Sequence, residues 1–328
     1  MNVIRNAVLV GSLALAFGAS MVRTAQATAV AQSVLQVVSL QFRNAGTGVA
    51  LDASNFDILN IQASTNLNPS LNGVFNPFST FTVGGAPLPL TVRCVPGACP
   101  AGLNPGAPFA NAATPPTVDG ALAASMLTGA PITGLGQPLG ATAKTSALAQ
   151  LVNPGVANSS ANIGMIAKLS FSLAQDTAMR MDFDSLLHML AFLDSDLTAN
   201  TGVGWSIDIK NHDNGATVFH WAPDGVIGTG INGGVELADG CNLQLSVGVF
   251  GPGTASADCS GSESAVTGLL LAANQYDLTI SDQNRADVLV SASSSGPSSS
   301  GPGLPEPSSV LLVALALAGL GFARRRTK

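Results

Sequence analysis

The chain has 328 residues, of which 46% are hydrophobic and only 10% are charged. Its formal net charge of −6 argues against nucleic-acid binding, because phosphates repel an acidic surface. The abundance of glycine (36) and proline (19) favours an exported, loop-rich β protein over a cytosolic helical enzyme.

The N-terminus has the composition of a secretory signal peptide over residues 1–31. Arg5 precedes an apolar run at 7–17, which is too short for a stable transmembrane helix. Small residues follow, and Ala25-Gln26-Ala27 and Ala29-Val30-Ala31 both fit a cleavage motif. We therefore expect cleavage after Ala27 or after Ala31, with a secreted domain over about residues 32–292.

Removal of both ends makes the remaining chain more acidic. Six of the 13 basic residues lie at the ends: Arg5, Arg23, Arg324, Arg325, Arg326 and Lys328. The remaining chain has seven basic residues and 18 or 19 acidic ones, depending on whether Glu306 is retained, so its net charge is −11 or −12. Such a charge keeps a protein soluble and attracts divalent cations.

The first strand is expected over residues 33–42. Val34, Val38, Leu40 and Phe42 alternate with other residues and are predicted to share one face. A second strand is predicted over 56–61.

Residues 66–164 are predicted to form a long, loop-rich insertion. Proline recurs in turn-forming steps such as Asn68-Pro69 and Pro115-Pro116. Within it we expect a strand at 78–83 and a short helix at 119–127 with Asp119 as its N-cap. Loops this long are either functional or poorly ordered.

Strong alternation returns at 165–173 and 178–184, which predicts an antiparallel pair joined through 174–177. Residues 186–193 form an apolar run around His188, which fits a buried strand or a helical turn. Further strands are predicted at 276–281 and 287–292. Many short strands and little helix predict a mainly β fold, an antiparallel, jelly-roll-like β-sandwich.

A hairpin is predicted over residues 202–224, because Asn214-Gly215 favours a two-residue type I′ turn. That turn pairs Ile209 with His220. Phe219 and Trp221 then fall on a face that also carries charged residues, where the two rings would be able to stack on sugars. The alternative is that both rings are packed under the insertion.

Four cysteines remain after processing, and an even number in an exported chain predicts disulfides. Proximity favours Cys94–Cys99 and Cys241–Cys259, although three pairings are open. A metal site is the alternative, but no Cys-x-x-Cys motif is present.

Few residues suggest catalysis. The three histidines are not expected to share a metal, and neither a Gly-x-Ser-x-Gly nor a His-Glu-x-x-His motif occurs. Asp194 and Asp196 have a spacing that is able to share Ca²⁺, with a solvated strand face or turn as the alternative. A carboxylate pair of a glycoside hydrolase is the least supported option. We therefore expect no enzymatic activity and no obligatory cofactor.

The C-terminus has three consecutive parts. A Ser/Gly/Pro linker at 293–303 precedes Pro305-Glu306-Pro307, an uncharged apolar segment at 308–323, and the basic cluster Arg324-Arg325-Arg326. The prolines keep the tripeptide extended. The apolar segment is predicted to be a hydrophobic sorting helix near the lower limit for a membrane span, and the arginines mark the cytoplasmic side.

This arrangement, at residues 304–328, resembles the PEP-CTERM sorting signal of Gram-negative bacteria. The resemblance implies export, transient anchoring in the inner membrane, and cleavage by an exosortase near Pro305-Glu306-Pro307. Leu304 stands where the commonest form has valine. The segment also carries a domain name that refers to ice-binding proteins, but it is an address and does not imply ice binding.

The resemblance leads us to expect a non-enzymatic protein of the cell surface or extracellular matrix, associated with exopolysaccharide and biofilm. The alternative is a carbohydrate- or calcium-binding module that uses Phe219 and Trp221, or Asp194 and Asp196. An enzyme that acts on matrix polysaccharide is less supported.

Overall fold

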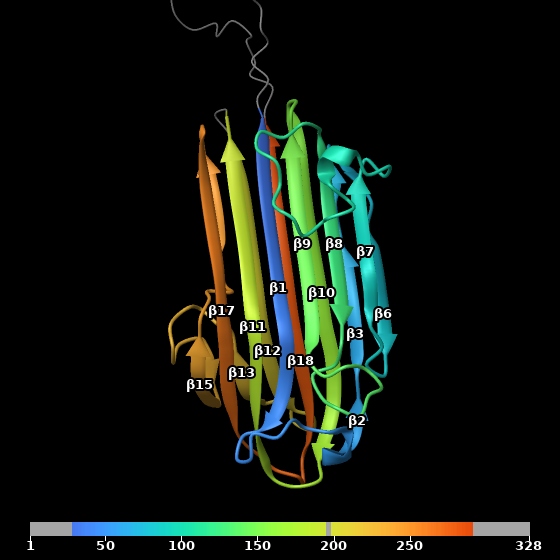
Figure 1. Ribbon diagram of the computed structural model, residues 1–328, viewed down its shortest axis with the longest axis vertical. Coiled ribbons are helices and arrows are strands. Elements are labelled where there is room, and N and C mark those ends of the chain that lie inside the picture. Colours follow the sequence, from blue (N-terminus) through green and yellow to red (C-terminus); the bar gives the residue numbers. More distant parts are fainter. Residues whose placement is uncertain (1–27, 195–197, 291–328) are drawn as a thin grey trace, which may run out of the picture. The chain divides into compact units, whose positions relative to one another are not determined.

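The computed structural model describes residues 28–194 and 198–290, with only the backbone for 162–169. This part of the chain is almost entirely β, with two antiparallel sheets lying one in front of the other (Figure 1). The seven-stranded sheet contains, in spatial order, β15 (Gly234–Asp239), β17 (Gly253–Leu270), β11 (Thr177–Leu193), β1 (Ala29–Asn44), β9 (Ala141–Leu151), β8 (Gly120–Thr128) and β7 (Leu88–Val95).

The eleven-stranded sheet forms the other layer. Its main order is β14 (Ile231–Asn232), β13 (Thr217–Trp221), β12 (Thr198–Asn211), β18 (Gln275–Val290), β10 (Gly155–Leu173), β3 (Gln62–Leu67) and β6 (Phe78–Val83). Four short strands pair beside this path: β16 (Ser246–Phe250), β2 (Phe56–Asn60), β4 (Ser70–Leu71) and β5 (Val74–Phe75). Two 3₁₀ turns lie at Ala53–Asn55 and Ala101–Leu103.

The inner faces of the two sheets share one core, as in a β-sandwich. At the end where β1 begins and β18 ends, the core is built mostly of small side chains, chiefly alanine. The rest of the core contains large side chains from both sheets, including Phe171, Phe183, Trp205, Trp221 and Tyr276. Alternation along long strands supplies these inner faces, because successive side chains point to opposite sides of a sheet.

Several predicted strands are confirmed, namely those at 33–42, 56–61, 78–83, 165–173, 178–184 and 276–281. Residues 186–193 continue β11 as a strand, and 287–290 continue β18. The prediction that 165–173 pairs with 178–184 is wrong. β10 and β11 lie in different sheets, and the short connection between them crosses from one layer to the other. The jelly-roll-like connectivity stays a prediction.

About half of the predicted insertion at 66–164 is strand. It contributes β7, β8 and β9 to the seven-stranded sheet, and its longest loops are 96–119 and 129–140. The predicted helix at 119–127 is wrong, since β8 spans Gly120–Thr128. Both faces of this strand are buried, so its apolar residues do not alternate with polar ones, and such a run resembles a buried helix.

The loop 96–119 covers the outer face of β8 and β9. Leu103 of this loop packs with Leu122 and Leu148 of the sheet to form a small second core. Asp119 is not a helix cap, because its carboxylate accepts hydrogen bonds from the backbone N–H groups of Val152 (2.6 Å) and Asn153 (3.0 Å). The carboxylate thereby ties the start of β8 to the turn after β9.

Candidate functional site

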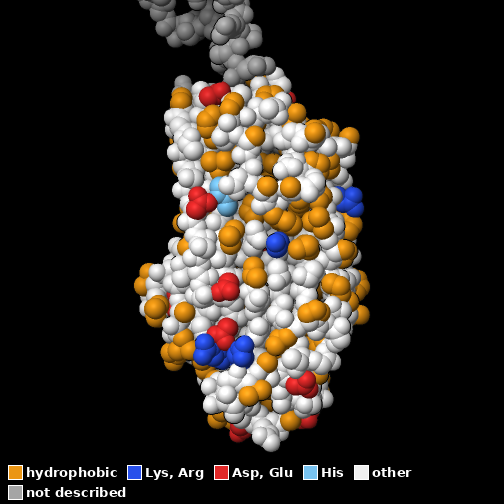
Figure 2. All heavy atoms as spheres, in the orientation of Figure 1, with side chains coloured by type: hydrophobic (Ala, Val, Ile, Leu, Met, Phe, Trp, Pro, Cys, Tyr) orange, Lys and Arg blue, Asp and Glu red, His pale blue; other side chains and the backbone are white. Residues whose placement is uncertain are grey.

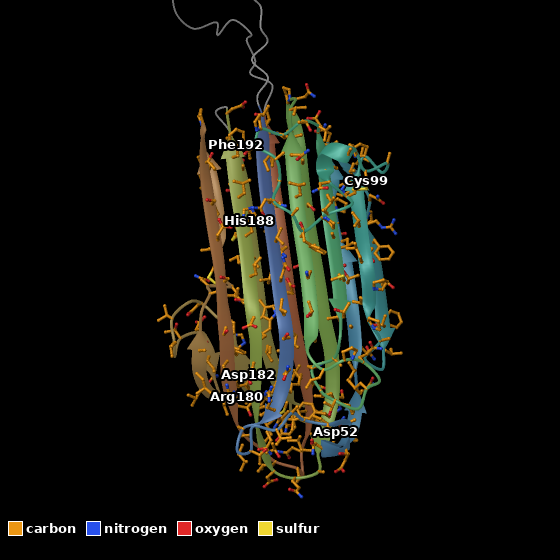
Figure 3. The ribbon with its side chains drawn as sticks, in the orientation of Figure 1. Asp52, Cys99, Arg180, Asp182, His188 and Phe192 are labelled. Atoms are coloured by element: carbon orange, nitrogen blue, oxygen red, sulfur yellow. A yellow bond between two sulfur atoms is a disulfide. The ribbon has the colours of Figure 1, made fainter. Side chains whose placement is uncertain are left out.

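A groove of about 550 Å³ lies on the outer face of the seven-stranded sheet. Side chains of β1, β11 and β17 line it, with Ala238 of β15 on one side. In Figure 2, basic and acidic side chains gather beside one another low on this face, and Figure 3 places Arg180 and Asp182 there.

A β-bulge in β1 brings two of the lining residues to the groove. The pairing of β1 with β11 shifts register between Val38 and Gln41, and Ser39 has a positive φ of 58°. The extra residue reverses the alternation, so Leu40 and Phe42 point into the core while Gln41 and Arg43 face the groove. The prediction that Val34, Val38, Leu40 and Phe42 share one face is therefore wrong.

The loop 129–140 passes close to this bulge. Gly140 has a φ of +97°, and a Cβ atom at this position would lie 3.3 Å from the Cα of Ser39. Glycine is thus required here both for backbone conformation and for space. The bulge is held against its neighbour in β9 rather than being a loose irregularity.

The groove is centred on a charged cluster. Arg180 Nε donates to Asp182 Oδ1 at 2.8 Å, and Arg43 Nε lies 3.5 Å from Asp182 Oδ2. Arg43 is also fixed by the Gly48 carbonyl (3.0 Å) and by Gln41 Oε1 (2.5 Å). The Arg180 side chain makes no further hydrogen bond to the described residues and is 42% exposed, so its terminal nitrogens are available to a ligand.

Serine hydroxyls complete the lining. Ser264 Oγ donates to Asp182 Oδ1 at 2.6 Å, and Ser262 Oγ donates to Asp184 Oδ1 at 2.7 Å. The groove therefore alternates planar charged groups with hydroxyls on a rigid sheet. Phe183, the aromatic residue of the lining, is only 3% exposed, so its ring offers little surface for stacking in the groove.

Two carboxylates of β15, those of Glu236 and Asp239, are held by hydrogen bonds from neighbouring residues. Glu236 accepts from Trp221 Nε1 (2.6 Å) and from the N–H of Gly228 (2.7 Å). Asp239 Oδ2 accepts from the N–H groups of Asp224, Gly225 and Val226. These bonds attach the loop 222–230 to β15.

Glu263 of β17 lies opposite Asp239 of β15 and is 1% exposed. It accepts hydrogen bonds from Ser185 Oγ (2.7 Å) and from the N–H of Gly240 (2.8 Å). Burial, reinforced by the neighbouring Asp239, raises the pKa of Glu263 to about 7. Glu236 is 4% exposed and is not among the residues that line the groove, whereas Glu263 belongs to the groove wall despite its low exposure.

The proposed sugar-stacking role of Phe219 and Trp221 is wrong, because both side chains are 0% exposed. The turn spans four residues, with Asn211 N–H donating to the Ala216 carbonyl, and a bulge follows at Lys210. Ile209 therefore pairs with Phe219 and not with His220. A one-residue shift moves every side chain to the opposite face, which turns both aromatic rings into the core.

The three histidines each pair with an aspartate, in separate places. His212 Nδ1 lies 2.8 Å from Asp277, His220 Nδ1 lies 2.8 Å from Asp208, and His188 Nδ1 lies 2.5 Å from Asp258. In the parts of the chain that the structure describes, no three His, Cys, Asp or Glu side chains are grouped so that they would hold a metal ion.

The calcium prediction involves Asp194 and Asp196. Asp196 lies outside the described residues. Both carboxylate oxygens of Asp194 are hydrogen-bonded to Thr28 instead. The carboxylate of Asp194 therefore serves a contact within the chain.

Both predicted disulfides are confirmed. Cys94 is bonded to Cys99 at the end of β7, and Cys241 is bonded to Cys259 across β15 and β17. The second bond lies beside a close backbone contact, where a Cβ atom at Gly240 would lie 2.7 Å from the Cα of Gly261. This disulfide links β17 to the residues that follow β15, close to Ala238 and Ser262 in the lining of the groove.

Comparison with known families identifies the class of signal that the chain carries. The PEP-CTERM protein-sorting motif matches residues 304–326. No curated protein and no solved structure matches the chain. The PEP-CTERM motif implies export and membrane-associated processing by an exosortase before a surface or extracellular location.

Residues 1–27 of the predicted signal peptide at 1–31, and the sorting segment at 304–328, lie outside the described residues. Within residues 28–194 and 198–290, no helix has the length and apolar character needed to cross a membrane. The cleavage residues Pro305, Glu306 and Pro307 are therefore assigned by the sequence motif alone.

Proposed function

We propose that this protein is a non-enzymatic component of the cell surface or extracellular matrix that binds exopolysaccharide through the groove on the seven-stranded sheet. The sorting motif supports the location. The observation that carries the binding proposal is the cluster of Arg43, Arg180 and Asp182 with adjacent serine hydroxyls. Planar groups of this kind form paired hydrogen bonds with sugar hydroxyls and carboxylates.

The position of the groove supports the same proposal. β1 begins at Ala29 and β18 ends at Val290, and both residues lie at one end of the strands (Figure 1). Arg43 and Arg180 lie toward the other end of β1 and β11. The two ends of the described domain therefore lie away from the groove.

The hydrogen-bonded state of the groove carboxylates supports a binding role over hydrolysis. A glycoside hydrolase needs one carboxyl group that donates a proton and a second that acts as base or nucleophile. Asp182 is engaged by two arginines and a serine, and Asp184 is engaged by Ser262. Both carboxylates are therefore held by contacts within the chain.

The test compares two matched arginine variants. Arg180→Ala removes the more open cation of the groove. Arg285→Ala removes an arginine of the other sheet that is likewise paired with the aspartate two residues later, since Arg285 Nε lies 2.7 Å from Asp287 Oδ2. Purified protein is run in gels that contain exopolysaccharide from the host or purified acidic and neutral polysaccharides, and the retardation of migration gives the affinity.

We expect Arg180→Ala to weaken binding by about tenfold, the effect of losing one charge-assisted hydrogen bond of at least ~1.5 kcal/mol. Arg285→Ala should leave binding unchanged. Equal retardation of the wild type and Arg180→Ala, with both folded, would argue against the groove as the binding site.

A further inference from the structure

The first described residue is held by an unusual set of contacts. Thr28 Oγ1 donates to Asp194 Oδ2 at 2.6 Å, and the Thr28 backbone N–H donates to Asp194 Oδ1. In return, the Asp194 backbone N–H donates to the Thr28 carbonyl at 3.1 Å. One carboxylate therefore receives both the backbone nitrogen and the hydroxyl of a single residue.

The next three residues belong to the core of the seven-stranded sheet. Ala29, Val30 and Ala31 are each 0% exposed. Ala29 pairs with Leu193 of β11 on one side and with Leu151 of β9 on the other. Residues 29–31 are thus part of a central strand, with neighbours on both edges and both faces.

The two cleavage sites suggested by the sequence have different consequences for this strand. Cleavage after Ala31 would remove three buried residues and leave β9 and β11 without a partner at their ends. Cleavage after Ala27 would leave β1 complete and would make Thr28 the first residue. The buried strand residues therefore discriminate between two sites that the sequence leaves equal.

We propose that export cleavage falls between Ala27 and Thr28, and that the new α-ammonium group of Thr28 forms an ion pair with the Asp194 carboxylate. The step is a hydrolysis by an export-associated endopeptidase. Water adds across the amide bond, Ala27 gains the carboxylate, and Thr28 gains the amine, which takes up a proton. No oxidant or cofactor is involved.

Cleavage changes the chemistry of the contact without moving it. Before cleavage the Thr28 nitrogen is a neutral amide with one N–H. After cleavage it is a cation with three N–H groups, placed against an oxygen that already accepts from it. A charged donor strengthens such a bond. The mature protein would therefore hold the start of β1 more firmly than the precursor does.

The first test identifies the N-terminus of the mature protein. The full chain is produced in a bacterium that exports it, and the secreted or membrane-released product is analysed by N-terminal sequencing and by the mass of its N-terminal peptide. We expect Thr28 as the first residue. A product that begins at Gln32, or that retains residues before Thr28, overturns the assignment.

The second test measures the ion pair in that exported protein. The rate of acylation of the α-amino group is compared between wild type and Asp194→Asn at mildly alkaline pH. Asp213→Asn is the matched control, since Asp213 lies in an exposed turn on another hairpin.

A partly exposed ion pair protects the amine by roughly two- to fivefold. We therefore expect acylation to be faster by that factor in Asp194→Asn and unchanged in Asp213→Asn. Equal rates in wild type and Asp194→Asn overturn the ion pair. Because asparagine keeps the size of the side chain and an oxygen acceptor, the comparison does not depend on a large change of fold.

Discussion

Three buried polar side chains, Thr145, Asp282 and Asn284, meet between the two sheets, and Asp282 is the ionisable one of the three. Asp282 of β18 is 3% exposed and accepts a hydrogen bond from Thr145 Oγ1 of β9, in the opposite sheet, at 2.9 Å from Oδ1 and 3.0 Å from Oδ2. Asn284 donates to the same threonine hydroxyl. Burial raises the pKa of Asp282 from 3.8 to about 8, and the Thr145 bond only partly opposes this effect.

The raised pKa makes stability depend on pH in a defined direction. Between about pH 4 and pH 8 the folded protein keeps a proton on Asp282 that the unfolded chain has lost, so this group lowers stability as the pH rises. Asp282→Asn removes that dependence. We expect the variant to match the wild type near pH 4 and to be increasingly more stable than it toward pH 8, as measured by urea unfolding.

Asp213→Asn is the control for this comparison, because Asp213 is exposed and away from the core. Glu263 also has a raised pKa, of about 7, so both the wild type and Asp282→Asn keep part of the pH dependence. Parallel stability curves for the wild type and Asp282→Asn would contradict a protonated Asp282 in the folded protein.

Single residues also explain where strand alternation fails to predict faces. The pattern of β1 is sound on each side of Ser39, but the bulge there reverses it. Serine has no strong preference for a positive φ, so nothing local marks the position. No local signal therefore places Arg43 beside Asp182, although Arg180 and Asp182 stand two residues apart on β11 and so share a face.

At the scale of elements, the loop 96–119 behaves as a third layer over part of the seven-stranded sheet. Two buried glutamines attach it. Gln32 donates to the Ala110 carbonyl (2.8 Å) and accepts from the Ala112 N–H (2.7 Å). Gln150 Nε2 donates to the carbonyls of Val118 (3.1 Å) and Gly102 (3.3 Å). Each buried amide thus finds its hydrogen-bond partners in the backbone of the loop.

Gln150→Ala should detach one end of this loop. The change removes two hydrogen bonds to part-buried carbonyls, which costs about 1–3 kcal/mol in the free energy of unfolding at ~0.5–1.5 kcal/mol for each bond. We also expect faster proteolysis within 96–119. Urea unfolding and limited proteolysis measure the two effects.

Gln283→Ala provides the control, because Gln283 is exposed on β18. A surface change of this kind stays within about 0.5 kcal/mol. If Gln150→Ala behaved like Gln283→Ala in both measurements, the loop would be held by its apolar contacts alone.

The elements show which parts of the fold a sequence is able to reveal. Strands with one buried face, such as β11, alternate clearly and were predicted. β8 is covered on both faces, so apolar and polar residues do not alternate along it, and its sequence predicts a helix instead. The hairpin was recognised from Asn214-Gly215, but the turn includes two further residues and the adjacent bulge shifts the register. Loop closure and register depend on long-range pairing, which a local pattern does not contain.

At the scale of the whole molecule, the described domain and the sorting signal perform separate tasks. The described domain has its own core, two disulfides and a groove, all formed by residues within 28–290. The motif at 304–326 follows a linker rich in serine, glycine and proline. Such a linker lets a processing enzyme reach its site without unfolding the domain.

This separation predicts that changes in the motif alter processing and leave the domain intact. In the full chain, replacement of Pro305-Glu306-Pro307 by three alanines should leave the uncleaved protein in the membrane fraction, since the tripeptide defines the sorting motif. Replacement of Gly301-Pro302-Gly303 by three alanines is the matched control, because it alters the same linker just before the motif. Fractionation and intact mass in the native host follow both. We expect the control to be processed normally and both variants to unfold at the wild-type temperature. Normal processing of the first variant would show that the enzyme recognises another feature, such as the arginines at 324–326.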